Sequence, residues 1–178
     1  MNNNWVIMMK IMVIFAGLFL LGATIAPKRS ASFWKKADKH LTRIFMDKQI
    51  EKTNVDYNEI NLAESGLKNI EIFLLRNGED SLGYLVLTSS MGRYESFDYM
   101  IVYNPVMKVK EIDILNYTSS HGGEVASQKW LKQFVGYEGN HLKYGSDIDA
   151  ITGATYSATS LVKDVESITI FMKKSQSH

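Results

Sequence analysis

Residues 70–87 read IEIFLLRNGEDSLGYLVL, two apolar runs separated by a polar turn. The runs are Ile70 to Leu75 and Tyr84 to Leu87, and both have the length of β-strands. Asn77-Gly78-Glu79-Asp80 lies between them and contains residues that favour a chain reversal. The stretch therefore predicts a pair of strands joined by a turn, and with it a sheet.

A second pair of strands is predicted further along the chain. Tyr99 to Tyr103 and Met107 to Leu115 are apolar runs on either side of Asn104-Pro105, which is another turn signal. The apolar phase shifts within the second run. This shift predicts a β-bulge near Lys110 and Glu111.

Helices are predicted on either side of these strands along the chain, because apolar residues recur there at helical spacing. The first helix is expected from Ala31 to Ile50, the second from Ser127 to Val135, and the third at the C-terminus. The inward residues expected in the last two are Trp130, Leu131, Phe134, Leu161, Val165, Ile168 and Met172. This order predicts an α+β domain with a mainly antiparallel sheet and flanking helices.

The N-terminal segment predicts a transmembrane anchor. Trp5 to Ala26 is almost wholly apolar apart from Lys10, and its length is close to the roughly 20 residues that a helix needs to cross a bilayer. A signal peptide cleaved after Ala26 is the alternative, although Pro27 disfavours cleavage there. A buried core helix is disfavoured because the run has no polar face. The predicted organisation is an anchor over 1–26, a linker helix over 27–55 and one domain over 56–178.

Composition excludes several partners and cofactors. Twenty Lys and Arg against nineteen Asp and Glu give a net charge of +1, without the basic excess that is typical of nucleic-acid binding. The chain has no cysteine, which excludes disulfides, cysteine-ligated metal centres and thioether-linked cofactors. A redox centre in this chain would therefore be an organic cofactor or a metal held by His and carboxylates.

Small and hydroxyl-bearing residues gather just before the C-terminal helix, where residues 149–157 read DAITGATYS. Small side chains let another molecule approach the backbone, and the free N–H groups at a helix start attract phosphate. A phosphoester on a threonine of this segment would thus be held by the backbone. The alternative is an ordinary turn at Gly153, with Ser157 or Thr159 as the N-cap of the helix.

The heptapeptide DAITGAT at residues 149–155 resembles the Asp-x-x-Ser/Thr-Gly-Ala-Thr motif of the FMN-binding domain family. That family includes the flavin-carrying subunits of the Rnf and Na+-pumping NADH:quinone oxidoreductase complexes, and the resemblance covers the chain from Gly83 to the last helix. It implies that a separate flavin transferase links FMN from FAD to Thr155 through a phosphodiester, recognising Asp149 and Gly153. The residues expected to lie against the cofactor are Thr152, Gly153, Ala154, Tyr156 and Ser157.

A second stretch, residues 117–125, resembles in position the second cofactor-side loop of the family. It reads His121-Gly122-Gly123-Glu124 where the Rnf and Na+-pumping subunits have Glu-Thr-Pro-Gly-x-Gly. Gly122 and Gly123 would let the backbone lie close to a flavin ring, and His121 could donate a hydrogen bond to it. The alternative is a glycine turn with Glu124 near a helix start. A metal site is disfavoured because His121 and Glu124 alone do not close a coordination sphere.

The expected function is electron transfer by a membrane-anchored flavoprotein. A covalent link would prevent the loss of FMN by dilution outside the cytoplasm, so the domain is expected on the extracytoplasmic, periplasmic side of the cell membrane. Charge counting points the other way, since more basic residues follow the anchor than precede it, but large domains translocate largely regardless of charge. These residues are Lys28, Arg29, Lys35 and Lys36 after the anchor, against Lys10.

The expected partners are the flavin transferase and membrane redox proteins. A carrier or redox-complex subunit is favoured over a self-contained enzyme, because few titratable groups mark a substrate pocket. Two alternatives remain. One is a stand-alone FMN-dependent reductase, and the other is a membrane-anchored binding or scaffolding domain that keeps the fold without the flavin.

Overall fold

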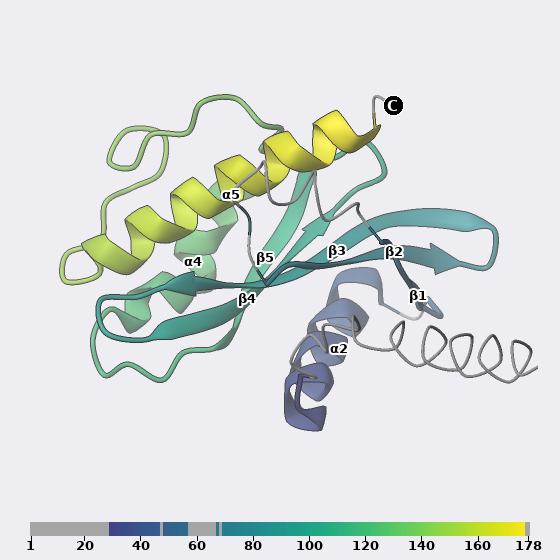
Figure 1. Ribbon diagram of the computed structural model, residues 1–178, viewed down its shortest axis with the longest axis horizontal. Coiled ribbons are helices and arrows are strands. Elements are labelled where there is room, and N and C mark those ends of the chain that lie inside the picture. The colour runs from purple at the N-terminus through teal and green to yellow at the C-terminus, as the bar shows by residue number, and fades with distance from the viewer. Residues whose placement is uncertain (1–28, 47, 57–66, 68, 177–178) are drawn as a thin grey trace, which may run out of the picture.

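A computed structural model describes residues 29–46, 48–56, 67 and 69–176, and within these residues a five-stranded antiparallel sheet forms the middle layer (Figure 1). The strands are neighbours in chain order: β1 (Glu51–Asn54), β2 (Glu71–Asn77), β3 (Asp80–Met91), β4 (Ser96–Tyr103) and β5 (Val109–Asn116). Helices flank this sheet. The predicted α+β class with an antiparallel sheet is therefore confirmed.

Both predicted hairpins are present. β2 pairs with β3, and β4 pairs with β5, in each case antiparallel. In the second hairpin Val102 pairs with Glu111, whereas the next residue, Tyr103, pairs with Val109. Lys110 is thus the extra residue of a β-bulge, as the shifted apolar phase predicts.

The first predicted helix is shorter than expected. α2 (Ala31–Phe45) begins at an N-cap, Ser30, whose hydroxyl accepts a hydrogen bond from the Phe33 N–H at 3.2 Å. It ends before Met46, which has a φ of 54° and so cannot continue a right-handed helix. The prediction that the helix runs to Ile50 is wrong, and strand β1 follows instead.

Helices cover both faces of the sheet (Figure 1). α5 (Thr155–Gln176) packs on one face, and its predicted inward stripe is buried there: Leu161, Val165, Ile168 and Met172. α2 covers the opposite face through four buried side chains: Phe33, Ala37, Leu41 and Phe45. Each fully buried aliphatic or aromatic side chain contributes about 1.5–3 kcal/mol. The burial of these stripes therefore fixes both helices on the sheet.

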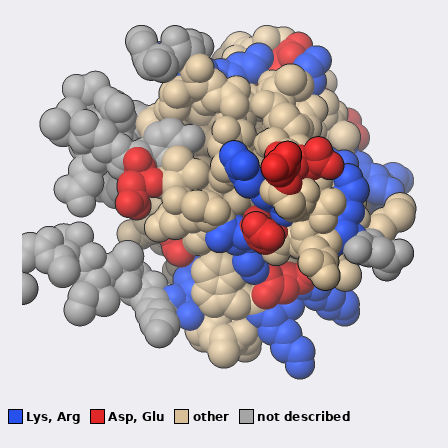
Figure 2. Space-filling view, turned by 90° about the vertical axis from the view of Figure 1, so that its right-hand side faces the viewer, with Lys and Arg blue, Asp and Glu red and all other residues tan. Residues whose placement is uncertain are grey.

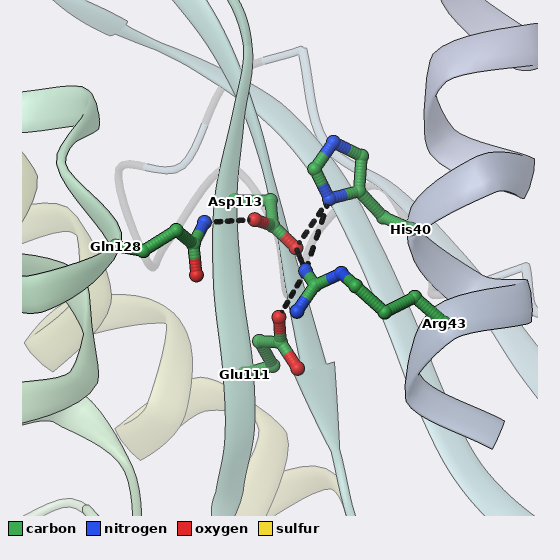
Figure 3. Close-up of polar contacts among 5 residues, drawn as sticks. All are labelled: His40, Arg43, Glu111, Asp113 and Gln128. Carbon is green, nitrogen blue, oxygen red and sulfur yellow. Dashed lines mark hydrogen bonds and ion pairs between the residues drawn. The ribbon is translucent and has the colours of Figure 1, made fainter. Parts of the chain in front are cut away.

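A polar cluster ties α2 to the edge strand β5 (Figure 3). The Asp113 side chain is almost fully buried; its Oδ2 lies 2.8 Å from His40 Nδ1 and accepts a hydrogen bond from Arg43 Nη2 at 2.9 Å. Arg43 also pairs with Glu111, and Gln128 donates from the other side to Asp113 Oδ1. The cluster compensates a buried carboxylate and joins two helices to one strand.

The second predicted helix is divided into short pieces. α4 (Gln128–Leu131) begins after Ser127, whose hydroxyl accepts from the Trp130 N–H, and continues as the 3-10 helix η2 (Lys132–Phe134). A further 3-10 helix, η1 (Gly123–Ala126), precedes it. The inward residues Trp130, Leu131 and Phe134 are buried as predicted.

The predicted membrane anchor, residues 1–26, lies outside the described residues. Among the residues that the structure does describe, no helix is long and apolar enough to span a bilayer.

Candidate functional site

An open groove of about 790 Å³ lies at the N-terminal end of α5, beside the turn between β3 and β4. Figure 1 shows that this end of α5 and the β3–β4 turn lie on the same side of the domain. Ligand pockets commonly have volumes of about 300–1,000 Å³. The groove is lined by Arg93, His121, Gly153, Ala154, Thr155, Tyr156, Ser157, Thr159, Ser160 and Lys163. The structure therefore brings part of the 149–157 segment and His121 to one place, although they are far apart in sequence.

Helix α5 begins at Thr155 itself. Its first intrahelical bond joins the Ala158 N–H to the Ala154 carbonyl at 2.9 Å. The N–H groups of the preceding residues, Thr155 to Ser157, therefore have no acceptor within the helix, and they form the positive end of its dipole. Ser157 and Thr159 lie inside the helix, so the alternative in which either one is an N-cap is wrong.

The backbone ahead of α5 is held by side chains from neighbouring segments. The Trp130 indole N–H donates to the Asp149 carbonyl at 2.8 Å, and the Asp149 N–H donates to Gln133 Oε1 at 2.9 Å. Two residues later the Ile151 N–H donates to the Tyr144 hydroxyl at 2.8 Å. The main chain of the segment is thus anchored, and its side chains remain free to face outward.

Three side chains of the predicted motif face solvent. Asp149, Thr152 and Thr155 are exposed. Gly153 has a φ of +82°, and a Cβ at this position would meet no atom within 4 Å. Glycine is therefore required here by the backbone conformation and not by lack of space. The result is a turn that places the exposed Thr155 in the lining of the groove.

The loop that contains His121 packs against the same turn. A Cβ on Gly122, which has a φ of +79°, would lie 2.8 Å from the Tyr117 hydroxyl and 3.4 Å from Ala154 Cα. Gly122 therefore permits the close approach of the two segments. His121 is exposed and lines the groove, and its Nδ1 lies 2.9 Å from Ser120 Oγ.

Gly123 and Glu124 belong to η1 and are exposed outside the groove lining. Among the described residues, no group of three His, Asp or Glu side chains could hold a metal ion.

Tyr117 links the His121 loop to the start of α5. Its hydroxyl donates to the His121 carbonyl at 2.7 Å and lies 3.2 Å from Ser157 Oγ. Because the Tyr117 proton is given to the carbonyl, Ser157 is the donor in the second bond. Ser157 is buried and lines the groove, so its contact with Tyr117 stabilises the groove wall.

The groove carries positive charge from residues that the sequence analysis did not single out. Arg93 comes from the β3–β4 turn and Lys163 from α5, and none of the lining residues is acidic. Lys163 lies eight residues after Thr155, so the two share a helix face with Thr159 between them. That spacing is the one signal in the sequence that could have found Lys163. Arg93 has no such signal, because the chain reversal at the end of β3 brings it to the groove.

A buried polar region lies beneath this part of α5. Burial raises the pKa of the Asp164 carboxyl, and the neighbouring hydroxyls of Ser90 and Tyr99 moderate the rise. Both hydroxyls are buried, and neither forms a hydrogen bond of good geometry with any residue that the structure describes. Burial, together with the negative charge of Asp164, also raises the pKa of Tyr99 well above its ordinary value.

The fold and the groove define an α+β domain suited to an anionic ligand held beside a helix N-terminus. The family follows from the sequence: residues 93–169 match the family model of the FMN-binding domain. This match agrees with the resemblance that the motif at residues 149–155 predicts. The match extends from the Arg93 wall of the groove through Lys163 and most of α5. No curated protein matches the chain.

The groove fits the cofactor that this family binds. FMN has an anionic phosphate, a polar ribityl chain and a flat ring. The helix start supplies free N–H groups, the lining supplies hydroxyls and cations, and the volume falls within the ligand-pocket range. The domain is therefore assigned FMN as its cofactor.

Proposed function

We propose that this chain is a membrane-anchored flavoprotein that carries FMN covalently on Thr155 and passes electrons between redox partners. The observation that carries the proposal is the position of Thr155. Its side chain is exposed at the first residue of α5, on a backbone turn held by Trp130, Gln133 and Tyr144. A modifying enzyme needs such an accessible hydroxyl on a pre-ordered segment.

The proposed attachment is a phosphoryl transfer from FAD catalysed by a flavin transferase. Thr155 Oγ forms a bond to the phosphorus of the FMN half, and the pyrophosphate P–O bond breaks. AMP leaves with the electron pair of that bond, and the threonine proton passes to a base of the transferase. The exposed Asp149 carboxylate and the turn at Gly153 are the features of this chain that the transferase would recognise.

Several groups of this chain would hold the bound cofactor. The free N–H groups at the start of α5 would face the phosphate. Ala154 is buried against Gly122, which sets the width of the groove beside the attachment point. The other lining residues proposed to border the cofactor are Gly153, Tyr156, Ser157 and His121. Thr152, Gly122, Gly123 and Glu124 adjoin the lining in the chain and are proposed to support it.

The proposed role is that of a carrier. FMN supplies one- or two-electron transfer, and the protein tunes its potential through charge and hydrogen bonds. The titratable groups of the lining are Arg93, His121, Tyr156 and Lys163, and no carboxylate accompanies the one imidazole. This lining supports electron transfer over acid–base chemistry on a substrate. Substrate-selective, saturable turnover of small acceptors by the flavinylated protein would favour a self-contained reductase.

The proposed location is the extracytoplasmic face of the cell membrane, with residues 1–26 as a single-pass anchor and membrane redox proteins as partners. The apolar run from Trp5 to Ala26 supports the anchor. The proposed covalent link is consistent with this location, because a dissociable cofactor would be lost where its free concentration is near zero.

The test is the intact mass and the absorbance of the full chain purified from a host that coexpresses a flavin transferase. The wild type should gain the mass of one FMN residue and be yellow. Thr155→Val should lose both the added mass and the colour. The matched control is Thr159→Val, the same chemical change one helical turn further along the groove, and it should keep both. An unmodified wild type would instead support the scaffolding alternative.

A further inference from the structure

Two cationic side chains border the groove from different elements. Arg93 stands on the turn between β3 and β4, and Lys163 stands on α5. Both side chains belong to exposed residues. The sheet and the helix thus each contribute one positive charge to the same cavity.

Lys163 lies in line with the proposed attachment point. Thr155, Thr159 and Lys163 are spaced four residues apart on α5, and all three line the groove. At about 1.5 Å of rise per residue, the Lys163 Cα lies about 12 Å along the helix from that of Thr155. A group that is bonded to Thr155 and follows the groove along α5 therefore runs toward Lys163.

Neither cation is neutralised by a carboxylate. Of the ion pairs between residues that the structure describes, none involves Arg93 or Lys163. The nearby carboxylate of Glu95 accepts a hydrogen bond from the Thr118 hydroxyl. The guanidinium of Arg93 lies 5.3 Å from the centre of the Tyr94 ring, a contact that leaves its charge uncompensated. The groove therefore carries a net positive charge that no fold-stabilising ion pair accounts for.

We propose that Arg93 and Lys163 set the redox potential of this domain by stabilising the negative charge that the flavin ring gains on reduction. The inference rests on the proposed covalent flavin. Two electrons and one proton added to the oxidised ring leave one negative charge at the N1–C2=O edge. A nearby cation favours that charged state over the neutral oxidised one, and so makes the potential less negative.

The experiment uses the full chain, flavinylated in the host, and measures the midpoint potential by a spectroscopic dithionite titration. Lys163→Gln and Arg93→Gln should each shift the potential to a more negative value, and the double variant should shift it further. Lys163→Arg keeps the charge and should keep the potential near that of the wild type. The matched control is Lys174→Gln, which removes the same charge from an exposed position about 16 Å further along the same helix.

The dependence of the potential shifts on ionic strength distinguishes an electrostatic effect from an effect of altered packing. The shifts should shrink between low ionic strength and 1 M salt, because the Debye length falls from about 30 Å at 0.01 M to about 3 Å at 1 M. A shift that arises from altered packing would persist in high salt.

The outcomes distinguish this inference from its premise. An intact mass without FMN in the wild type would overturn both. A flavinylated wild type whose Lys163→Gln and Arg93→Gln variants keep its potential, or shift no more than Lys174→Gln, would overturn the inference alone. A normal FMN mass in each variant, together with a salt-sensitive negative shift, would support it.

Discussion

The Tyr103 hydroxyl is a buried polar group whose hydrogen bond joins two elements of the core. Tyr103 and Thr169 are both fully buried, and their hydroxyl oxygens lie 2.9 Å apart. Thr169 gives its own proton to the Val165 carbonyl at 2.6 Å, so Tyr103 must donate to Thr169. The bond therefore satisfies a buried O–H at the contact between β4 and α5.

Thr169→Val should lower the free energy of unfolding by about 1–3 kcal/mol, because it leaves the Tyr103 O–H buried without its acceptor. Urea unfolding at neutral pH measures the effect. In a Tyr103→Phe background the same substitution should cost much less, since no donor is left unpaired. An equal cost in both backgrounds would show that the loss comes from packing alone.

The raised pKa of Asp164 predicts that the stability of the fold depends on pH. Its pKa is raised in the folded state by burial, so the folded chain holds this proton at pH values where the unfolded chain has released it. Stability should then fall as the pH rises from the unfolded pKa toward the folded pKa, and the loss persists at neutral pH.

Asp164→Asn should remove this loss, because the amide has no charge to bury. The melting temperature of the variant should exceed that of the wild type at pH 7, and the two should converge in acid below the unfolded pKa of about 3.9. Thermal unfolding across this pH range measures the difference. A variant that is less stable than the wild type at pH 7 would show that the charged carboxylate stabilises the fold.

At the scale of elements, the sequence predicts those strands, turns and helices that have a local pattern of apolar and turn-forming residues. Apolar runs on either side of turn signals locate both hairpins, and the shifted apolar phase locates the bulge at Lys110. β1 could not be predicted, because its four residues, Glu51 to Asn54, are all exposed and show no apolar pattern. They join the sheet only by backbone pairing with β2. The end of α2 could not be predicted either, because the residue with a positive φ that ends the helix is Met46 and not a glycine.

The same distinction applies to the site. The Thr155 segment and the His121 loop are visible as small-residue stretches in the sequence. Arg93 and Lys163 become part of the groove only when the β3–β4 turn and α5 are placed side by side. Contacts of this kind depend on tertiary packing, which periodicity does not specify.

Gly83 lies where the backbones of β3 and β4 approach each other closely. It has a φ of +118°, and a Cβ there would lie 1.9 Å from the Tyr103 carbonyl oxygen on β4. Gly83→Ala should destabilise the fold by about 2–6 kcal/mol, the sum of about 1–3 kcal/mol of backbone strain and about 1–3 kcal/mol of overpacking.

The matched control is Gly78→Ala in the β2–β3 turn. Gly78 also has a positive φ, +61°, but a Cβ there meets nothing within 4 Å, so the cost should be only about 1–2 kcal/mol of left-handed strain. Chemical denaturation of both variants measures the difference. Equal costs would show that β3 and β4 can separate to admit the methyl group.

At the scale of the whole molecule, the sheet separates two regions. One face carries α5 and the groove, and the other carries α2, which follows the predicted anchor directly in the chain (Figure 1). On the side that bears the β2–β3 turn, basic and acidic side chains are interspersed and form no single patch (Figure 2). The groove differs from that side, because its lining has cations and no acid.

The central claim is that FMN is bonded to Thr155, and peptide mapping by mass spectrometry tests it most directly. Trypsin should release residues 144–163 as one peptide, since it cleaves after Lys143 and Lys163. In protein from a host with a flavin transferase, this peptide should carry the mass of one FMN residue, and fragment ions should place it on Thr155. FMN on another residue, or an unmodified peptide in yellow protein, would contradict the account.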